Sequence, residues 1–377
     1  LHKFDLNFTK STMKNANKVS RSFQHMILLC GCLLIYYSVS ARQHKPTESG
    51  YIAQKTQGID SDYVLIFNSY SESAPWCRSL VDSTVMDLIK LSPQTMTVTQ
   101  NLNSGLLRDE KALAQLRQQV DVSYHDKPRM IIYIGSTSWP FLHETIEKKW
   151  GKVPSIIFSD IDYTGPITNL LRKTPIAPAL RIPYDKIVKE YEGALSVVYM
   201  PIYLRQSLAL MHQLTPPMTE LCFISDTRWI SAQMRADMAA ITKTDFPELK
   251  VRYLISADMS TLDLLDSLQH YGQETGVLFF SWLKQSQVGD SFVNDSHFRI
   301  IISKSARQPL FVLNDNEVNT DSDVLGGYFP TRAAVSHHIR LALEKTLAGQ
   351  PGSFQTVEPA QPVIDYLTLI RKGISPD

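Results

Sequence analysis

The sequence predicts an α/β protein in which two Rossmann-like lobes, each with a parallel sheet, are joined by a hinge. Short apolar runs recur along the chain, each stops at a small polar residue, and helix-like stretches separate them. Runs of this length between helical patterns are typical of buried parallel strands in alternating β and α order. The arrangement occurs twice, in two similar halves, which favours two lobes over one large sheet.

The predicted elements follow the same order in both halves. In the first half, strands are expected at 64–68, 96–100, 130–134 and 155–158, and helices at 74–91, 109–120 and 140–150. In the second half, strands are expected at 220–224, 251–255, 277–280, 310–313 and 325–328, and helices at 230–241 and 261–271. Each strand–helix–strand unit has the length of a βαβ element with short connections.

The segments outside these units predict how the lobes are joined. A Pro-rich stretch at 174–199 ends in a strand-like run at 196–199, which we expect to cross the hinge ahead of a helix at 202–214. The expected parts are a leader at 1–41, a linker at 42–60, a first lobe at 61–195, a second lobe at 196–330, and a helix and return segment packing across the hinge at 331–377.

The leader differs in composition from the rest of the chain. Five basic residues precede an almost entirely apolar run at 26–39, and Val39-Ser40-Ala41 fits a small-residue cleavage site. This order is typical of a secretory signal peptide, and an uncleaved anchor in the inner membrane is the alternative. Either interpretation predicts a periplasmic or other extracytoplasmic location for the remainder of the chain. Cys77 and Cys222 lie far apart in the sequence, and we expect them to be separate buried thiols.

Composition and motifs narrow the function. The chain has 377 residues, of which 44% are hydrophobic, and its net charge of +1 offers no electrostatic footprint for nucleic acid. No GxSxG, GxGxxG, Walker or HExxH motif is present, so we expect no enzyme activity, no cofactor and no metal. The adjacent His337 and His338 point to different faces of a predicted helix and are not expected to share a metal.

Candidate ligand-binding residues follow from the strand ends, because open parallel sheets bind ligands beyond the carboxyl ends of their strands. The predicted ligand-binding residues, which lie at or just after the strand ends, are Ser69, Tyr70, Ser71, Trp76, Gly135, Ser136, Thr137, Ser159, Asp160, Asp226, Ser281, Trp282 and Gly327.

Several of these residues have a structural alternative. Ser71 or Ser73 is expected to cap the following helix, whether or not it also contacts a ligand, and Asp160 and Asp226 fit helix capping as well as ligand binding. Trp76 fits either a stacking contact or a brace for its loop. Gly327 fits a backbone approach to the cleft or a β-bulge.

Motifs at both ends resemble a known family. The strings VLIFNSY at 64–70 and APW at 74–76, together with PVIDY at 362–366, Leu369 and Gly373-Ile374, are similar to the ABC-type substrate-binding-like sensor domain of bacterial membrane histidine kinases and diguanylate cyclases. Substrate-binding proteins of ABC transporters share its fold. The resemblance covers residues 61–376.

The resemblance implies a type I periplasmic binding fold that closes over a small molecule and passes ligand occupancy to a membrane signalling module, as in two-component signal transduction. A stand-alone protein that serves an ABC permease is the alternative. The expected ligand is an amino acid, a sugar or an aromatic metabolite, and a homodimer is one expected assembly. The chain departs from the family by stopping at Asp377 without a kinase. We therefore expect either a signalling part beyond it or a stand-alone binder.

Overall fold

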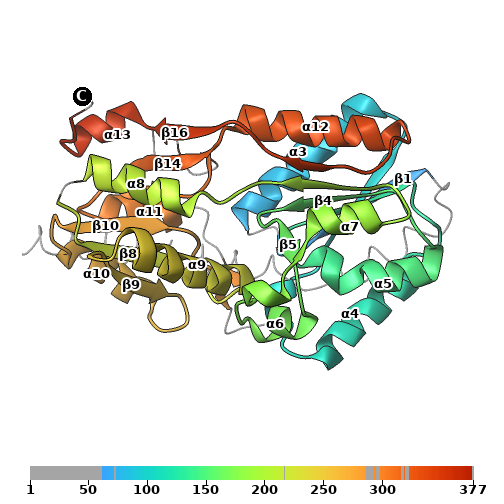
Figure 1. Ribbon diagram of the computed structural model, residues 1–377, viewed down its shortest axis with the longest axis horizontal. Helices are drawn as coiled ribbons and strands as arrows, with labels where there is room; N and C mark the ends of the chain where they lie inside the picture. Colours follow the sequence, from blue (N-terminus) through green and yellow to red (C-terminus); the bar gives the residue numbers. More distant parts are fainter. Residues whose placement is uncertain are drawn as a thin grey trace, which may run out of the picture. The chain divides into compact units, whose positions relative to one another are not determined.

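The computed structural model of the protein describes residues 62–375, apart from 72–73, 216, 286–291, 294–297, 316–317 and 319–321. The predicted signal peptide or anchor and the linker, residues 1–60, lie outside the described residues. Within the described part, no helix is both long and apolar enough to span a bilayer. Two six-stranded sheets dominate this part of the chain (Figure 1).

The first sheet has the strand order β15-β7-β4-β3-β1-β2, and all its neighbouring strands run parallel. Its strands are β1 (Tyr63–Asn68), β2 (Met96–Asn101), β3 (Met130–Ile134), β4 (Ser155–Ser159), β7 (Leu195–Tyr199) and β15 (Phe354–Thr356). Every residue of β1, β3 and β4 is buried, as expected where helices cover both faces of a parallel sheet.

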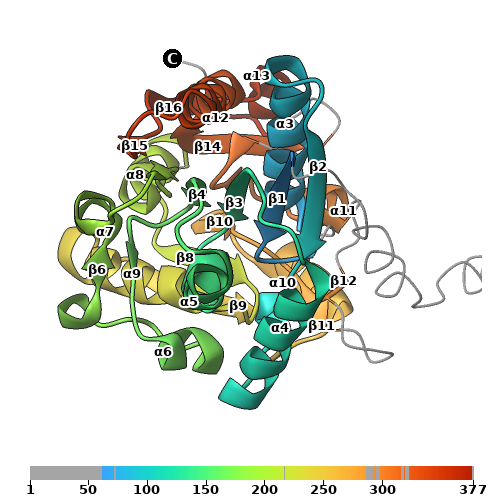
Figure 2. The same cartoon turned by 90° about the vertical axis from the view of Figure 1, so that its right-hand side faces the viewer.

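Four long helices cover the first sheet. The helices α3 (Pro75–Leu91) and α12 (Arg332–Leu347) pack against each other, and so do α4 (Glu110–Ser123) and α5 (Ser138–Trp150). Figure 2 shows the first pair on one side of the sheet and the second pair on the other. The shorter α7 (Tyr184–Glu190) packs against β7.

The second sheet has the order β16-β14-β13-β10-β8-β9, parallel except for the antiparallel pair of β14 and β16. Its strands are β8 (Glu220–Ser225), β9 (Lys250–Ile255), β10 (Thr275–Phe279), β13 (Leu310–Val312), β14 (Val324–Pro330) and β16 (Ala360–Ile364). Its helices are α8 (Leu204–Leu214), α9 (Trp229–Asp245), α10 (Thr261–His270), α11 (Phe298–Ser305) and α13 (Tyr366–Arg371).

The predicted fold class is confirmed, and the long predicted strands and helices are present within a few residues of their expected bounds. Short elements were missed, because they lie in Pro-rich or irregular segments where hydrophobic periodicity is weak. The missed elements are β5 (Tyr163–Thr164), α6 (Ile167–Arg172), β6 (Ile182–Pro183), α7, β11 (Lys284–Gln285), β12 (Phe292–Val293), α11, β15 and the 3₁₀ turns η1 (Ser104–Leu106) and η2 (Pro178–Leu180).

The expected crossing strand is placed differently by the structure. Residues 196–199, expected to cross the hinge at the start of the second lobe, form most of β7, which pairs with β4 and β15 inside the first sheet. The physical reason is burial, since Leu195, Val197 and Val198 are fully enclosed there. The predicted return segment is divided between the lobes, because α12 packs on the first lobe and β16 joins the second sheet.

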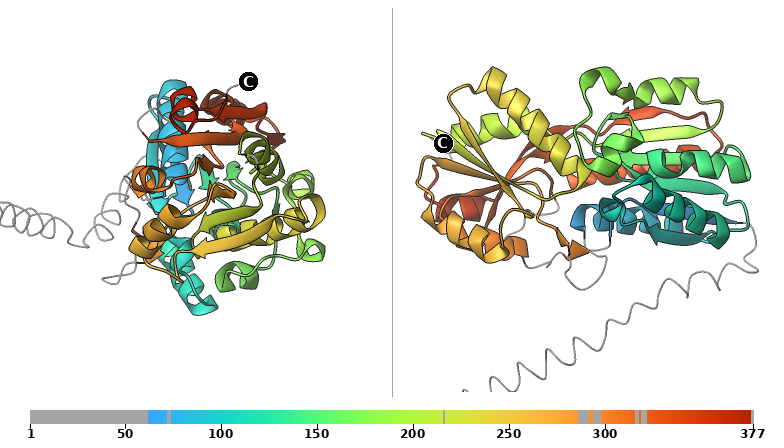
Figure 3. Two further views of the ribbon diagram at one scale, coloured as in Figure 1. Left: turned by 90° about the vertical axis from the view of Figure 1, so that its left-hand side faces the viewer. Right: turned by 90° about the horizontal axis from the view of Figure 1, so that it is seen from below.

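Three connections join the two lobes within the described residues. The chain passes from β7 to α8 through Met200–Tyr203, from β14 to α12 at Thr331, and from β15 to β16 through 357–359. Figure 3 shows these crossings between the lobes. At the connections, the Val357 N–H donates to the Tyr199 carbonyl at 2.8 Å, and the rings of Tyr203 and Tyr328 meet at 5.5 Å.

Strand order predicts where each lobe binds ligands. In the first sheet, the chain winds in opposite directions from β1, to β2 on one side and to β3 on the other, and in the second sheet β8 has the same relation to β9 and β10. A crevice for ligands forms beyond the carboxyl ends of the strands at such a switch point. The loops after β1, β3, β8 and β10 are therefore the natural place for a site.

Candidate functional site

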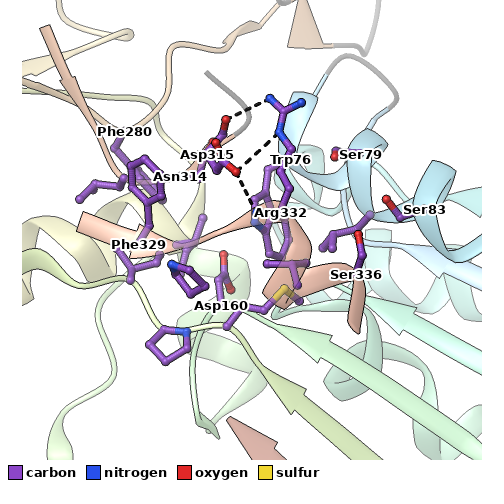
Figure 4. A pocket seen from close by; sticks show the side chains of 18 of the residues that line it. Trp76, Ser79, Ser83, Asp160, Phe280, Asn314, Asp315, Phe329, Arg332 and Ser336 are labelled. Atoms are coloured by element: carbon purple, nitrogen blue, oxygen red, sulfur yellow. Dashed lines mark hydrogen bonds and ion pairs between the residues drawn. The ribbon is translucent and has the colours of Figure 1, made fainter. Parts of the chain in front are cut away.

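A cavity of about 160 Å³ lies between the lobes and is lined by residues of both (Figure 4). Helices α3 and α12 form one side, the loops after strands of both sheets form another, and the connections at Met200 and Pro330 close it. The lining residues are Tyr70, Trp76, Ser79, Leu80, Ser83, Asp160, Met200, Pro201, Ile202, Arg228, Ile230, Phe280, Leu313, Asn314, Asp315, Phe329, Pro330, Arg332, Val335 and Ser336.

Aromatic side chains form much of the apolar lining. Trp76 comes from the first turn of α3 in the first lobe, whereas Phe280 and Phe329 come from the second lobe, at the end of β10 and within β14. Figure 4 shows the two phenylalanines together on one side of the pocket and Trp76 on the other. A ligand between them would contact both lobes.

Arg228 belongs to the second lobe, and its positively charged guanidinium reaches the first lobe. Its backbone N–H and its Nε donate to the two carboxylate oxygens of Asp226 at 2.9 and 2.8 Å, and the Ser231 hydroxyl donates to the same carboxylate at 2.6 Å. The Arg228 guanidinium lies 4.6 Å from the centre of the Tyr70 ring, a cation–π contact between the lobes. Both charged side chains are buried, so the pair is neutralised locally.

Asp160 is a buried carboxylate of the first lobe, at the end of β4. Burial raises its pKa to about 6, although its own backbone N–H and the Arg228 charge lower it. Its Oδ1 atom has no hydrogen-bond partner within the described part of the chain, and the same holds for the Tyr70 hydroxyl and the Ser136 hydroxyl. Buried polar atoms without partners are uncommon in folded proteins, which marks this group as a place where a ligand or water supplies the missing bonds.

Ser69 and its neighbours build the loop rather than line the pocket. The Ser69 Oγ accepts from the Ser138 N–H at 2.9 Å and from the Thr137 N–H at 3.4 Å, which satisfies free donors at the start of α5. The Thr137 hydroxyl lies 2.7 Å from that of Ser104. Gly135 has φ +88°, and an added Cβ would meet Ser69 at 2.8 Å, so glycine is required for this close packing.

Ser71 and Ser159 also have local roles. The Ser71 carbonyl accepts from the Ala74 N–H, and the N-cap of α3 is Ala74, without a side-chain cap hydrogen bond. Ser73 lies outside the described residues, so the capping of α3 by Ser71 or Ser73 stays a prediction. Ser159 is fully buried and its Oγ accepts from the Ile161 N–H at 3.2 Å.

The second-lobe candidates lie around the pocket without lining it. Asp226 holds the loop before α9 and orients Arg228, which itself occupies the N-cap of α9. Ser281 lies 3.3 Å from Ser231 through their hydroxyls. Trp282 is 4% exposed and its Nε1 donates to the Thr261 hydroxyl, so it packs in the core beside α10 instead of forming a pocket wall.

Gly327 lies within β14, where an added Cβ would meet the Val312 carbonyl oxygen at 2.0 Å. The pairing of β13 with β14 shifts register between Leu310 and Phe311. Because Leu310 pairs with Val324 and Phe311 with Gly326, the extra residue is Leu325, and Gly327 follows this irregularity in regular pairing with Val363.

Among the thirteen predicted ligand-binding residues, Tyr70, Trp76 and Asp160 line the pocket. Further lining residues were not predicted from the sequence, namely Arg228, Phe280 and Phe329. Asp315 and Arg332 were not predicted either; they form a pair in which the Arg332 backbone N–H donates to Asp315 Oδ2 at 2.8 Å. Arg228 comes two residues after Asp226, at a strand end already singled out, so its position was a usable signal. The aromatic residues belong to apolar strand runs that look the same whether they face a core or a cleft.

A direct contact between the lobes lies on another flank, between the segment 174–181 and α9. The Trp229 indole N–H donates to the Thr174 carbonyl at 3.0 Å, and the Ile176 N–H donates to the Gln233 side chain at 2.9 Å. Arg181 lies 3.4 Å from Asp237. We refer to these contacts as the α9 latch, because they hold the lobes together without any ligand.

Two neighbouring serines provide a test of the structural role of Ser69. Replacing Ser69 by Ala leaves the N–H groups at the start of α5 unsatisfied, and we expect a loss of about 1–3 kcal/mol in the free energy of unfolding. Ser136 is equally buried, but its hydroxyl has no partner among the residues that the structure describes, so Ser136→Ala should change this free energy by less than about 1 kcal/mol. Urea unfolding of both variants measures the difference, and equal losses would contradict the assignment.

Burial of Asp160 predicts a pH-dependent cost to stability. Its pKa of about 6 lies above the ordinary value of 3.8, so the folded protein binds the proton more tightly than the unfolded chain does. Stability should therefore fall as pH rises from about 4 to 6 and stay reduced above that range, by at most about 3 kcal/mol. In ligand-free protein, Asp160→Asn should remove this dependence. The variant should gain stability relative to the parent between pH 4 and pH 7, measured by urea unfolding at each pH, and a constant difference would refute the assignment.

No protein-family model matches the sequence, and no curated protein matches it. Solved structures do match. A conserved domain protein from Vibrio cholerae O1 biovar El Tor aligns with a TM-score of 0.53 at 9% identity, over 84% of this chain and 96% of that one. An ABC domain in complex with L-Trp from Streptococcus pneumoniae aligns with a TM-score of 0.50 at 12% identity, over 83% and 95%.

A subunit of an ABC sugar transporter from Rhodobacter sphaeroides is also similar, with a TM-score of 0.48 at 13% identity, over 82% of this chain and 99% of that chain. At these identities the likeness concerns the fold. Two parallel-sheet lobes, three connections and a cavity between the lobes agree with it. The chain has the type I periplasmic binding protein fold.

Proposed function

We propose that this protein is the extracytoplasmic sensory input of a two-component signalling protein, and that it closes over a small molecule in the cavity between its lobes. The observation that carries the proposal is the origin of the cavity lining. Trp76 and Asp160 come from the first lobe, Arg228 and Phe280 from the second, and Met200 from a connection between them. A ligand that contacts both lobes and the hinge favours the closed arrangement, and this population shift is the signal.

The comparisons support small-molecule binding, because the ABC domain from Streptococcus pneumoniae, which shares the fold, is in complex with L-Trp. The same neighbour favours a second candidate, a stand-alone substrate-binding protein of an ABC transporter. The motifs at 64–76 and 362–374 favour the sensor. We propose no catalytic role, because the pocket residues are explained by binding and the sequence carries no recognised catalytic motif.

The α9 latch sets how much ligand is needed for closure. Its hydrogen bonds are made only when the lobes are together, so they lower the free energy of the closed form before any ligand binds. If a fraction of the protein is closed without ligand, the apparent dissociation constant is the intrinsic one divided by that fraction. Residues of the latch should then change affinity without contacting the ligand.

A pair of tryptophan substitutions tests this. Trp229→Phe removes the indole N–H that bonds Thr174 across the lobes, and we expect about 2- to 10-fold weaker ligand binding, since one hydrogen bond contributes about 0.5–1.5 kcal/mol. Trp150→Phe is the matched control, because its indole bonds His125 within the first lobe. Calorimetric titration gives the affinities, and small-angle scattering gives the compactness of each variant. Equal affinities in the two variants would show that the latch has no part in closure.

The function itself is tested in two steps. A thermal-shift screen of the protein against amino acids, amines, organic acids and sugars should find a compound that raises the unfolding temperature, because a ligand at 100 times its dissociation constant stabilises by about 2.7 kcal/mol. Absence of any stabilising compound counts against the proposal. Deletion of the gene then separates the candidates. Loss of ligand-dependent gene expression with normal uptake supports a sensor, and loss of uptake supports transport.

A further inference from the structure

We propose that the ligand of this pocket carries a protonated primary amine, which binds the Asp160 carboxylate and the Tyr70 hydroxyl. This inference rests on the proposed function and assigns the chemical class of the ligand. It follows from the balance of charge in the cavity and from the hydrogen bonds that its buried atoms lack.

The charges around the cavity leave one carboxylate without a counter-ion in contact. Arg228 is paired with Asp226 at 2.8 Å, and Arg332 is paired with Asp315. Asp160 lines the cavity and makes no ion pair within the described part of the chain. Arg228 acts on Asp160 only at longer range, and Asp226 offsets its charge. An ionised carboxylate in a buried site is stabilised by an opposite charge, so a cation fits this position better than a neutral or negative group.

The unsatisfied oxygens specify the kind of cation. Asp160 Oδ1, the Tyr70 hydroxyl and the Ser136 hydroxyl are all buried and all lack a partner within the described residues. They follow three adjacent strands at one level, because Asn68 pairs with Ile134, Ile134 pairs with Phe158, and each of the three residues comes two positions after one of these. A primary ammonium can donate to the Asp160 carboxylate and to the Tyr70 hydroxyl, which both line the cavity, whereas Ser136 is not among the lining residues. A quaternary amine has no donor and would leave both of these groups unsatisfied.

The remaining cavity limits the body of the ligand. Trp76, Phe280 and Phe329 supply aromatic walls of the cavity (Figure 4). The volume of about 160 Å³ is similar to the engineered apolar cavity of about 150 Å³ that holds benzene. A single ring with a short aminoalkyl arm therefore fits the closed form. An anion at the same place would face the Asp160 carboxylate.

The Nη groups of Arg228 are the donors that a carboxylate on the ligand would use. Only the backbone N–H and Nε of this arginine are used by Asp226, and its side chain is 9% exposed, toward the cavity. An amino acid and a simple amine share the ammonium that the proposal requires. The experiment therefore includes both.

Three compounds of nearly equal size test the proposal by calorimetric titration and thermal shift at pH 7.5. They are 2-phenylethylamine, L-phenylalanine and 3-phenylpropionate, which differ in whether they carry an amine, a carboxylate or both. We expect binding of at least one of the two amines, with 3-phenylpropionate at least about tenfold weaker. We expect Asp160→Asn to weaken amine binding about tenfold or more, and Tyr70→Phe to weaken it severalfold.

Each outcome separates this inference from the proposed function. Stronger binding of 3-phenylpropionate, or an amine affinity unchanged in Asp160→Asn, overturns the amine assignment and leaves small-molecule binding intact. If none of the three compounds binds, the stabilising compounds of the metabolite screen decide. A hit that has a primary amine and loses affinity in Asp160→Asn supports the assignment, and any other hit overturns it. A screen without a hit removes the proposed function as well. Retained or increased stability of ligand-free Asp160→Asn shows that lost binding is not lost folding.

Discussion

The buried pair of Asp226 and Arg228 is the interaction on which the pocket depends. It fixes the loop after β8 through a carboxylate that accepts the Arg228 N–H, its Nε and the Ser231 hydroxyl. The same arginine lies on the Tyr70 ring of the other lobe. Removal of one partner from a buried ion pair leaves an uncompensated charge and destabilises by about 3–5 kcal/mol. The pair therefore holds the loop after β8 and the Arg228 side chain in one geometry, and its two charges neutralise each other.

With Arg228 and Asp226 paired, Asp160 is a carboxylate of the first lobe that lines the pocket. Burial raises the pKa of Asp160 in spite of the nearby Arg228 guanidinium. The pocket thus contains a carboxylate whose ionisation is unfavourable in the folded protein. Within the described residues, its Oδ1 atom and the Tyr70 hydroxyl lack hydrogen-bond partners. Folded proteins tolerate such costs mainly at functional sites, where a ligand relieves them. The same atoms reduce the stability of the empty protein and supply the selectivity proposed for the ligand.

Closure has two contributions that the structure separates in space. The pocket lies beside the connections at Met200 and Pro330, so a ligand there acts near the hinge. The α9 latch lies on another flank and acts without ligand through the bonds of Trp229 and Gln233. A stronger latch would raise affinity and also raise the closed population of the empty protein, which weakens the signal. The balance between the two contributions determines the response to ligand.

The sequence by itself determined the fold class and the position of nearly every long strand and helix. Buried parallel strands are short continuous apolar runs, and the run at 130–134 was placed correctly to the residue because a strand buried on both faces tolerates no polar interruption. It also placed the polar ends of the strands at one edge of each sheet, and so identified Tyr70, Trp76 and Asp160 before the cavity was known.

Only the tertiary structure decided which polar groups face the cavity. Ser69 and Ser136 have the same side chain and follow neighbouring strands. The Ser69 hydroxyl accepts from the start of α5, whereas the Ser136 hydroxyl has no partner in the described part of the chain. Three further features could not be predicted from the sequence. Residues 195–199 belong to the first sheet, Trp282 is buried beside α10, and the Arg228 guanidinium lies over the Tyr70 ring. Each depends on contacts between residues far apart in sequence, and local pattern carries no information about which distant side chain supplies the partner.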